Sequence, residues 1–189
     1  MRRGFKAEAE RLAERTRTQL GLRPHDQADI RQLAKHLNVE VIAADGLVDR
    51  ARLEELEQTQ AGAFSAATFH LPGGRTIAVY NPCSDPGRTN SDIGHEIAHI
   101  LLDHDVREIQ QIAGHTFITC NPEQEEEATW LAGCLLLPRA LLLREAYNGT
   151  SAETIADKYQ VSPHMARFRL NTSGVLLQAR RTRTKRAPQ

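Results

Sequence analysis

Residues 95–104 are the most informative segment of the chain and read His95-Glu96-Ile97-Ala98-His99-Ile100-Leu101-Leu102-Asp103-His104. Its first five residues have the pattern H-E-x-x-H. On a helix, His95 and His99 lie one turn apart on the same face, so both imidazoles can bind one metal ion. Glu96 projects beside them, where it can accept a proton from a water molecule that the metal activates. The stretch therefore predicts a helix that carries part of a metal site.

The surroundings of this pattern favour a metal site over the alternative, two satisfied histidines in an ordinary core. The pattern fixes only three positions and also occurs by chance. Here it interrupts an apolar run: Ile93, Ile97, Ala98, Ile100, Leu101 and Leu102. Polar side chains in a half-buried helix need partners, because burying them unpaired is costly. Turn formers precede the helix, and Asn90 or Ser91 is predicted to cap it. The pattern thus predicts a zinc hydrolase that acts on peptide bonds.

The composition is that of an ordinary soluble domain. The chain has 189 residues, of which 40% are hydrophobic and 25% charged, and its net charge is zero, so overall electrostatics select no partner. Its beginning lacks the apolar segment of a signal peptide, and no apolar stretch reaches the length of a membrane span. Three widely spaced cysteines, Cys83, Cys120 and Cys134, are typical of reduced thiols. These features predict a cytoplasmic protein with no membrane contact.

The pattern of helices and strands predicts an α+β fold, with helices around a small, mainly antiparallel sheet. In chain order, we expect a helix over 5–20, a helix capped by Asp26, a strand over 39–42, a charged helix or loop over 49–60, a hairpin of 64–70 and 76–80, the motif helix, and a helix over 123–137.

The C-terminal part predicts a helical hairpin. A capping box, Thr150 to Glu153, opens a short helix, and Ser162-Pro163 opens a second one. Together they resemble a helix-turn-helix, although such hairpins more often serve only for packing. The last residues are basic and are predicted to be disordered. The expected organisation is a main domain over 1–148, the hairpin segment over 149–178 packed on it, and a tail over 179–189.

A catalytic zinc site needs a third protein ligand, and the residues directly after the motif are poor candidates. His104 and His115 are interpreted as exposed loop histidines. Asp103 and Asp105 follow the first two ligands so closely that their geometry is awkward.

The acidic cluster on the next predicted helix is better placed, because its carboxylates can approach the motif helix from across the core. Glu125 shares a face with small side chains, which let two helices come close. Glu127 shares a face with larger ones, and it stays open as the alternative third ligand. The cluster consists of Glu123, Glu125, Glu126 and Glu127.

Two separated blocks resemble the ImmA/IrrE metallo-endopeptidase family. The first is Asn81-Pro82 followed by the motif helix. The second is Glu125-x-Glu127-Ala128-x-x-Leu131-Ala132-x-x-Leu135-Leu136-Leu137-Pro138. The chain departs from the family pattern at Thr129, where the family has Asn or Asp that could hold a ligand histidine. Leu131 and Leu137 replace Phe and Met.

The resemblance implies a zincin-like fold and a Zn²⁺ site with His95, His99 and Glu125 as ligands and Glu96 as base. It also implies a protein substrate, a helix-turn-helix repressor. Two alternatives stay open, a non-catalytic antirepressor and a DNA-binding regulator, although direct nucleic-acid binding is not expected. The donor that assists the oxyanion is also open, and the candidates are Tyr80, Arg139 and Tyr147.

Overall fold

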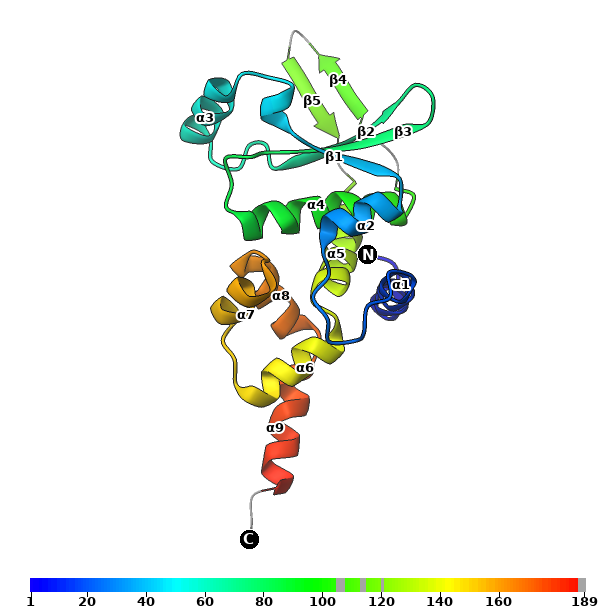
Figure 1. The fold of residues 1–189 in the computed structure, drawn as a ribbon, viewed down its shortest axis with the longest axis vertical. Coiled ribbons are helices and arrows are strands. Elements are labelled where there is room, and N and C mark those ends of the chain that lie inside the picture. Colours follow the sequence, from blue (N-terminus) through cyan, green and yellow to red (C-terminus); the bar gives the residue numbers. More distant parts are fainter. Residues whose placement is uncertain (105–107, 113–114, 120, 187–189) are drawn as a thin grey trace.

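The structure is a computed structural model that describes residues 1–104, 108–112, 115–119 and 121–186. Figure 1 shows a sheet at one end of the molecule, two long crossing helices below it, and a group of short helices at the other end. The helices are α1 (Phe5–Gln19), α2 (Ile30–His36), the 3₁₀ turn η1 (Ala44–Gly46), α3 (Arg50–Thr59), α4 (Pro86–Leu101), α5 (Pro122–Leu136), α6 (Arg139–Asn148), α7 (Ala152–Tyr159), α8 (Pro163–Thr172) and α9 (Val175–Arg186). The strands are β1 (Val39–Ala43), β2 (Ala66–Leu71), β3 (Arg75–Tyr80), β4 (Glu108–Ile112) and β5 (His115–Thr119).

The main sheet has the strand order β1-β3-β2 and confirms the predicted hairpin. Strands β2 and β3 are antiparallel, and the turn between them uses Gly73 and Gly74 at positive φ, where glycine carries no Cβ penalty. Strand β1 is parallel to β3. Helix α4 contacts β2 and β3, so the sheet lies against the helix that carries the motif. The α+β fold class is therefore as predicted, and it is consistent with a zincin-like fold.

A second hairpin, β4–β5, was not expected from the sequence. The two strands pair antiparallel, with Glu108 opposite Thr119. Their sequences are largely polar and do not alternate clearly, which explains why the strand pattern was weak.

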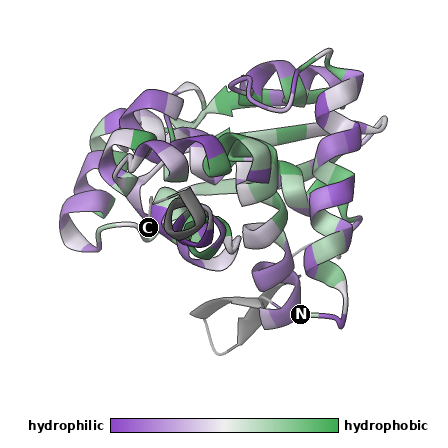
Figure 2. Cartoon of the chain, turned by 90° about the horizontal axis from the view of Figure 1, so that it is seen from below, coloured by the Kyte–Doolittle hydropathy of each residue, from purple (hydrophilic) through white to green (hydrophobic). Residues whose placement is uncertain are grey.

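The hydrophobic core lies where α1, α4 and α5 meet. Helix α5 is almost entirely buried beyond its first turn, and α1 places a stripe of small residues against it. Figure 2 shows the hydrophobic and hydrophilic residues alternating along α1, beside the N label. Fully buried side chains include Phe5, Ile93, Ile97, Leu131 and Leu135. Within the described ranges, no helix is long and apolar enough to span a membrane.

Three helices begin at other residues than predicted. Asp29, not Asp26, caps α2, since its carboxylate accepts from two backbone amides of the first turn. Helix α4 begins earlier, at Pro86, with Asp85 as its cap, because proline is well suited to the first helical position. Ser151 caps α7, whereas the hydroxyl of the neighbouring Thr150 donates to a buried glutamate of α6.

The expected caps of α4, Asn90 and Ser91, bind the C-terminal hairpin instead. The side-chain amide of Asn90 donates to the carbonyl of Gln160, and the hydroxyl of Ser91 accepts from the amide of Ser162 at 2.8 Å. A Cβ atom on Gly87 would lie 2.6 Å from the carbonyl oxygen of Val161, so this close approach requires glycine. The hairpin of α7 and α8 therefore packs tightly on the start of the motif helix.

The basic tail is helical where a disordered end was expected. Residues 179–186 belong to α9, which contacts α6. The reason is apolar contact, because Val175 and Ala179 are buried. The prediction of a disordered tail is wrong for these residues, while 187–189 lie outside the described part. Two of the three cysteines, Cys83 and Cys134, are free thiols, as the sequence predicts. Burial raises the pKa of the Cys134 thiol to about 12. Cys120 lies outside the described residues.

Candidate metal centre

Three of the predicted site residues converge between α4 and α5. His95 and His99 lie one turn apart near the end of α4, and Glu125 lies in the first turn of α5. The Nε2 atom of His95 is 3.1 Å from Nε2 of His99 and 3.1 Å from Oε2 of Glu125. The Nε2 atom of His99 is 3.6 Å from Oε1 of Glu125. Among the residues that the structure describes, this is the group whose ligating atoms gather closely enough to hold a metal ion.

The spacing of these atoms fits a tetrahedral ion. Ligand bonds of about 2.0–2.1 Å, as zinc makes to nitrogen and oxygen, place two ligand atoms of a tetrahedron about 3.3 Å apart. The two imidazole nitrogens are 3.1 Å apart, close to that value, and the Glu125 carboxylate lies beside both of them, with Oε2 3.1 Å from His95 and Oε1 3.6 Å from His99. Two imidazoles and one carboxylate are also a ligand set of catalytic zinc sites with an open fourth position. The residues present therefore fit a metal of this kind.

Glu96 lies beside this group on the side of the sheet. It is 4% exposed, and its Oε2 atom accepts a hydrogen bond of 2.8 Å from the hydroxyl of Thr68 on β2. The strand thus holds the carboxylate that the sequence proposes as base. Sequence reasoning did not single out Thr68, because nothing local marks a hydroxyl on a strand as the partner of a helix residue.

His104 is not the exposed loop histidine that the sequence suggested. Its side chain is only 6% exposed, and its Nδ1 atom lies 3.0 Å from Nδ1 of His99. The turn after α4 explains this position. Asp103 adopts φ 50°, the amide of His104 donates to the carbonyl of His99, and the amide of Asp103 donates to that of Ile100, which is a Schellman motif. The motif turns the chain so that His104 lies alongside His99.

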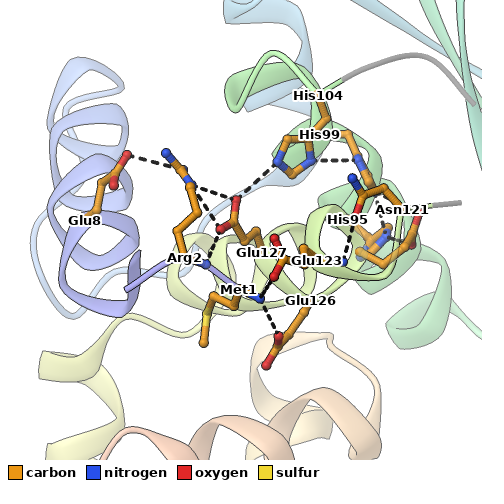
Figure 3. A network of polar contacts seen from close by, with 11 residues as sticks. Met1, Arg2, Glu8, His95, His99, His104, Asn121, Glu123, Glu126 and Glu127 are labelled. Atoms are coloured by element: carbon orange, nitrogen blue, oxygen red, sulfur yellow. Dashed lines mark hydrogen bonds and ion pairs between the residues drawn. The ribbon is translucent and has the colours of Figure 1, made fainter. Parts of the chain in front are cut away.

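Glu127, the alternative third ligand, points away from the three converging atoms. Its Oε2 atom is 3.6 Å from Nε2 of His104, and its Oε1 atom accepts from the backbone amide of Arg2 at 2.9 Å and from its Nε at 3.0 Å. Burial raises the pKa of Glu127, but the hydrogen bonds from Arg2 outweigh it, so the net pKa is lowered. Burial and the neighbouring His99 lower the pKa of His104. Figure 3 shows these side chains as one connected network.

The other members of the acidic cluster face outward. Glu123 and Glu126 are exposed, and their carboxylates lie 3.5 and 3.1 Å from the amino group of Met1. Glu123, in the first turn of α5, also interacts favourably with the helix dipole.

The side chain of Thr129 contacts His95, one of the two predicted histidine ligands. Its hydroxyl lies 3.4 Å from Nδ1 of His95, at the long end of hydrogen-bond distance. The shorter side chain thus fills the place that the resemblance gives to Asn or Asp, with a weaker contact.

Two of the three candidates for an oxyanion donor are engaged elsewhere. Arg139 lies on α6, and its guanidinium donates to Ser173 and Gln178. The hydroxyl of Tyr147 contacts Thr182 on α9. Both Arg139 and Tyr147 lie on α6, which begins after α5 has run about three turns, roughly 16 Å, from Glu125 to its end at Leu136. Both therefore make their contacts at the end of α5 that is remote from the metal group, which consists of His95, His99 and Glu125. Tyr80, at the end of β3 with the guanidinium of Arg31 over its ring, is the remaining candidate.

A further carboxylate on α4, Asp92, is half-buried one turn before Glu96. Its Oδ2 atom lies 3.6 Å from Nε of Arg88 and accepts no hydrogen bond from the described residues. Burial raises the pKa of Asp92 from 3.8 to about 6, against the opposing charge of Arg88.

Asp92→Asn is expected to raise the free energy of unfolding of the metal-free protein at pH 7 by about 1–3 kcal/mol. A folded-state pKa above the unfolded value penalises the folded state once the group is ionised. The penalty is therefore complete above about pH 6, shrinks as the pH falls, and vanishes below about pH 4. Urea unfolding at pH 7 and at pH 4 measures it. An equal gain at both pH values would contradict this explanation.

The fold and the site together define a zincin-like protein of the metallopeptidase class: an H-E-x-x-H helix under a small sheet, with a carboxylate supplied by the next long helix. The chain belongs to the peptidase family described as the IrrE N-terminal-like domain, which it matches over residues 34–171. The resemblance drawn from the two sequence blocks is thereby confirmed. Neither the curated proteins nor the solved structures that were compared gave a match.

Proposed function

We propose that this protein is a zinc-dependent endopeptidase in which His95, His99 and Glu125 bind the metal and Glu96 is the catalytic base. The observation that carries the proposal is the convergence of the two imidazoles and the Glu125 carboxylate, whose ligating atoms lie within 4.8 Å of one another, next to a buried glutamate. The family membership supports the same reaction class.

The chemistry follows from the positions of these residues. A zinc ion bound there supplies a Lewis acid that polarises a peptide carbonyl and lowers the pKa of water. Glu96, held by Thr68, accepts the proton of the attacking water and returns it to the leaving amine.

Strand β2 is a suitable site for an extended substrate. Among the described strands it pairs with β3 alone, so we propose that a peptide strand adds at its other edge. Since β2 also carries Thr68, a peptide bound along this edge passes close to the base.

We further propose that the substrate is a helix-turn-helix repressor, as the resemblance to the ImmA/IrrE family implies, and that the enzyme acts in the cytoplasm where such a repressor works. The test is incubation of the zinc-loaded protein with helix-turn-helix repressors encoded near its gene. Discrete fragments, lost with a chelator and restored by zinc, are expected. A stable complex without cleavage would favour the alternative, a non-catalytic antirepressor.

The contacts of the C-terminal hairpin argue against a DNA-binding regulator. Its three basic residues are all engaged within the molecule: Lys158 with Glu145 at 2.8 Å, Arg167 with Glu153 at 2.8 Å, and Arg169 with Glu10 at 2.9 Å. Arg169 is fully buried. Few charges are thus left in this segment for phosphate contacts, on which DNA affinity largely depends.

A gel-shift titration on the protein's own promoter region tests this point. We expect only weak binding that disappears at physiological salt, because non-specific contacts are lost as salt increases. Tight, sequence-selective binding at physiological salt, in the absence of any repressor, would overturn this view and favour the regulator.

A further inference from the structure

The second ring nitrogen of His99 begins a chain of polar contacts that leads away from the metal group. Nδ1 of His99 meets Nδ1 of His104 at 3.0 Å, and Nε2 of His104 meets Oε2 of Glu127 at 3.6 Å. Glu127 in turn accepts from Arg2. Figure 3 shows His99, His104, Glu127 and Arg2 in this order.

The chain of contacts has one consistent arrangement of protons if His99 is to bind a metal. A ligand Nε2 must present a lone pair, so the ring proton of His99 has to sit on Nδ1. That proton needs an acceptor, which makes Nδ1 of His104 unprotonated and places the proton of His104 on Nε2. This second proton points at Glu127, a carboxylate that can only accept when ionised.

Arg2 fixes the end of this chain. Its backbone amide and its Nε both donate to Glu127, at 2.9 and 3.0 Å, and its guanidinium carbon lies 5.2 Å from the centre of the Phe5 ring. Arg2 is 125 residues away from Glu127 and lies outside residues 34–171, the part that matches the family. A segment outside the matched residues thus reaches the back of the metal group.

We propose that His104, Glu127 and Arg2 are positioning residues that hold His99 in the tautomer whose Nε2 is free to bind the metal. The inference rests on the proposed metal-dependent function and assigns part of the metal affinity to residues that do not touch the metal. Partners of this kind fix the tautomer and orientation of a ligand histidine, and their loss typically costs about 10–100-fold in metal affinity. For His95, the corresponding partner is Thr129 at 3.4 Å, a weaker contact.

The first test is zinc affinity, measured by competition with a chelator. His104→Phe keeps the ring shape and removes both nitrogens, and Glu127→Ala removes the acceptor; each is expected to weaken zinc binding about 10–100-fold. The double variant should bind about as weakly as either single one, because Glu127 acts only through His104. Arg2→Ala should cost less than about tenfold, since its backbone amide still donates and exposed ion pairs contribute little.

The matched control is Glu126→Gln, on the same turn of α5. Its carboxylate is exposed and contacts only the amino group of Met1 among the interactions described, so zinc affinity should stay within about twofold of wild type. Unchanged affinity in His104→Phe and Glu127→Ala would overturn the inference. So would independent losses that multiply in the double variant, as expected from merely structural damage. Thermal unfolding identifies variants that do not fold. If neither variant folds, the ring tautomer of His99 in the wild-type protein decides: a proton on Nε2 instead of Nδ1 would overturn the inference.

The second test reads the tautomer directly and involves no activity. In the metal-free protein, ¹⁵N NMR of the His99 ring should show the proton on Nδ1, and His104→Phe should shift a substantial fraction to Nε2. An unchanged ratio would refute the inference. The two proposals fail separately: zinc binding with an intact chain of contacts but no cleavage contradicts only the proposed function. Variants with wild-type affinity and tautomer contradict only this inference.

Discussion

Glu96→Gln is expected to leave the fold and zinc binding intact and to lower the cleavage rate at least about 10³-fold, within the range that general acid–base groups contribute. Glutamine has nearly the same shape, and its amide oxygen can still accept the hydrogen bond that Thr68 donates in the wild type. It cannot take a proton from water. Binding and chemistry should therefore separate in this variant.

The measurement combines zinc titration, thermal unfolding and a cleavage assay on the same preparation. Glu54→Gln makes the same chemical change on the exposed face of α3, where the carboxylate pairs only with Arg50 in the interactions described, and it should cleave at the wild-type rate. A Glu96→Gln protein that cleaves as fast as wild type would remove Glu96 from the mechanism.

Glu125→Ala should prevent stable zinc binding, whereas the wild-type protein should bind about one zinc ion per monomer. The variant loses one of three protein ligands, and the two remaining histidines leave the ion largely exposed to water. Glu127→Ala, in contrast, should keep the zinc site. Its carboxylate faces His104 and Arg2, so the variant should still reach one zinc per monomer when zinc is saturating, with weaker affinity.

Titration with a zinc indicator, checked by elemental analysis, separates stoichiometry from affinity. The assignment of the third ligand is wrong if Glu125→Ala binds zinc as the wild type does while Glu127→Ala has no site at saturating zinc. Glu127 would then take that role.

The sequence predicts the three converging residues because each lies in a strongly patterned helix. The spacing of His95 and His99 fixes their common face, and the small side chains beside Glu125 allow α4 and α5 to approach closely. Helical periodicity thus carries the information on these positions. Their roles as ligands stay predictions until metal binding is measured.

The surrounding partners could not be predicted in the same way. His104 depends on a left-handed residue at Asp103, a conformation in which glycine is the usual signal. Arg2 and Thr68 reach Glu127 and Glu96 from distant parts of the chain, and no local pattern records such a contact. The sequence does not mark Asp85 as a cap for a related reason: Asp85-Pro86-Gly87 has the composition of a turn, although it begins the helix.

Helix α5 separates the metal group from the apolar core along its length. Its first turn bears Glu125, while the residues that hold the fold together, including Leu131 and Leu135, follow further along and are fully buried. Small zinc domains lack such a core and unfold when the ion is removed. We therefore expect the polypeptide to stay folded without the proposed ion. If the protein is the metal-dependent enzyme proposed above, the supply of metal would turn the activity of an existing molecule on or off, with no need for new synthesis.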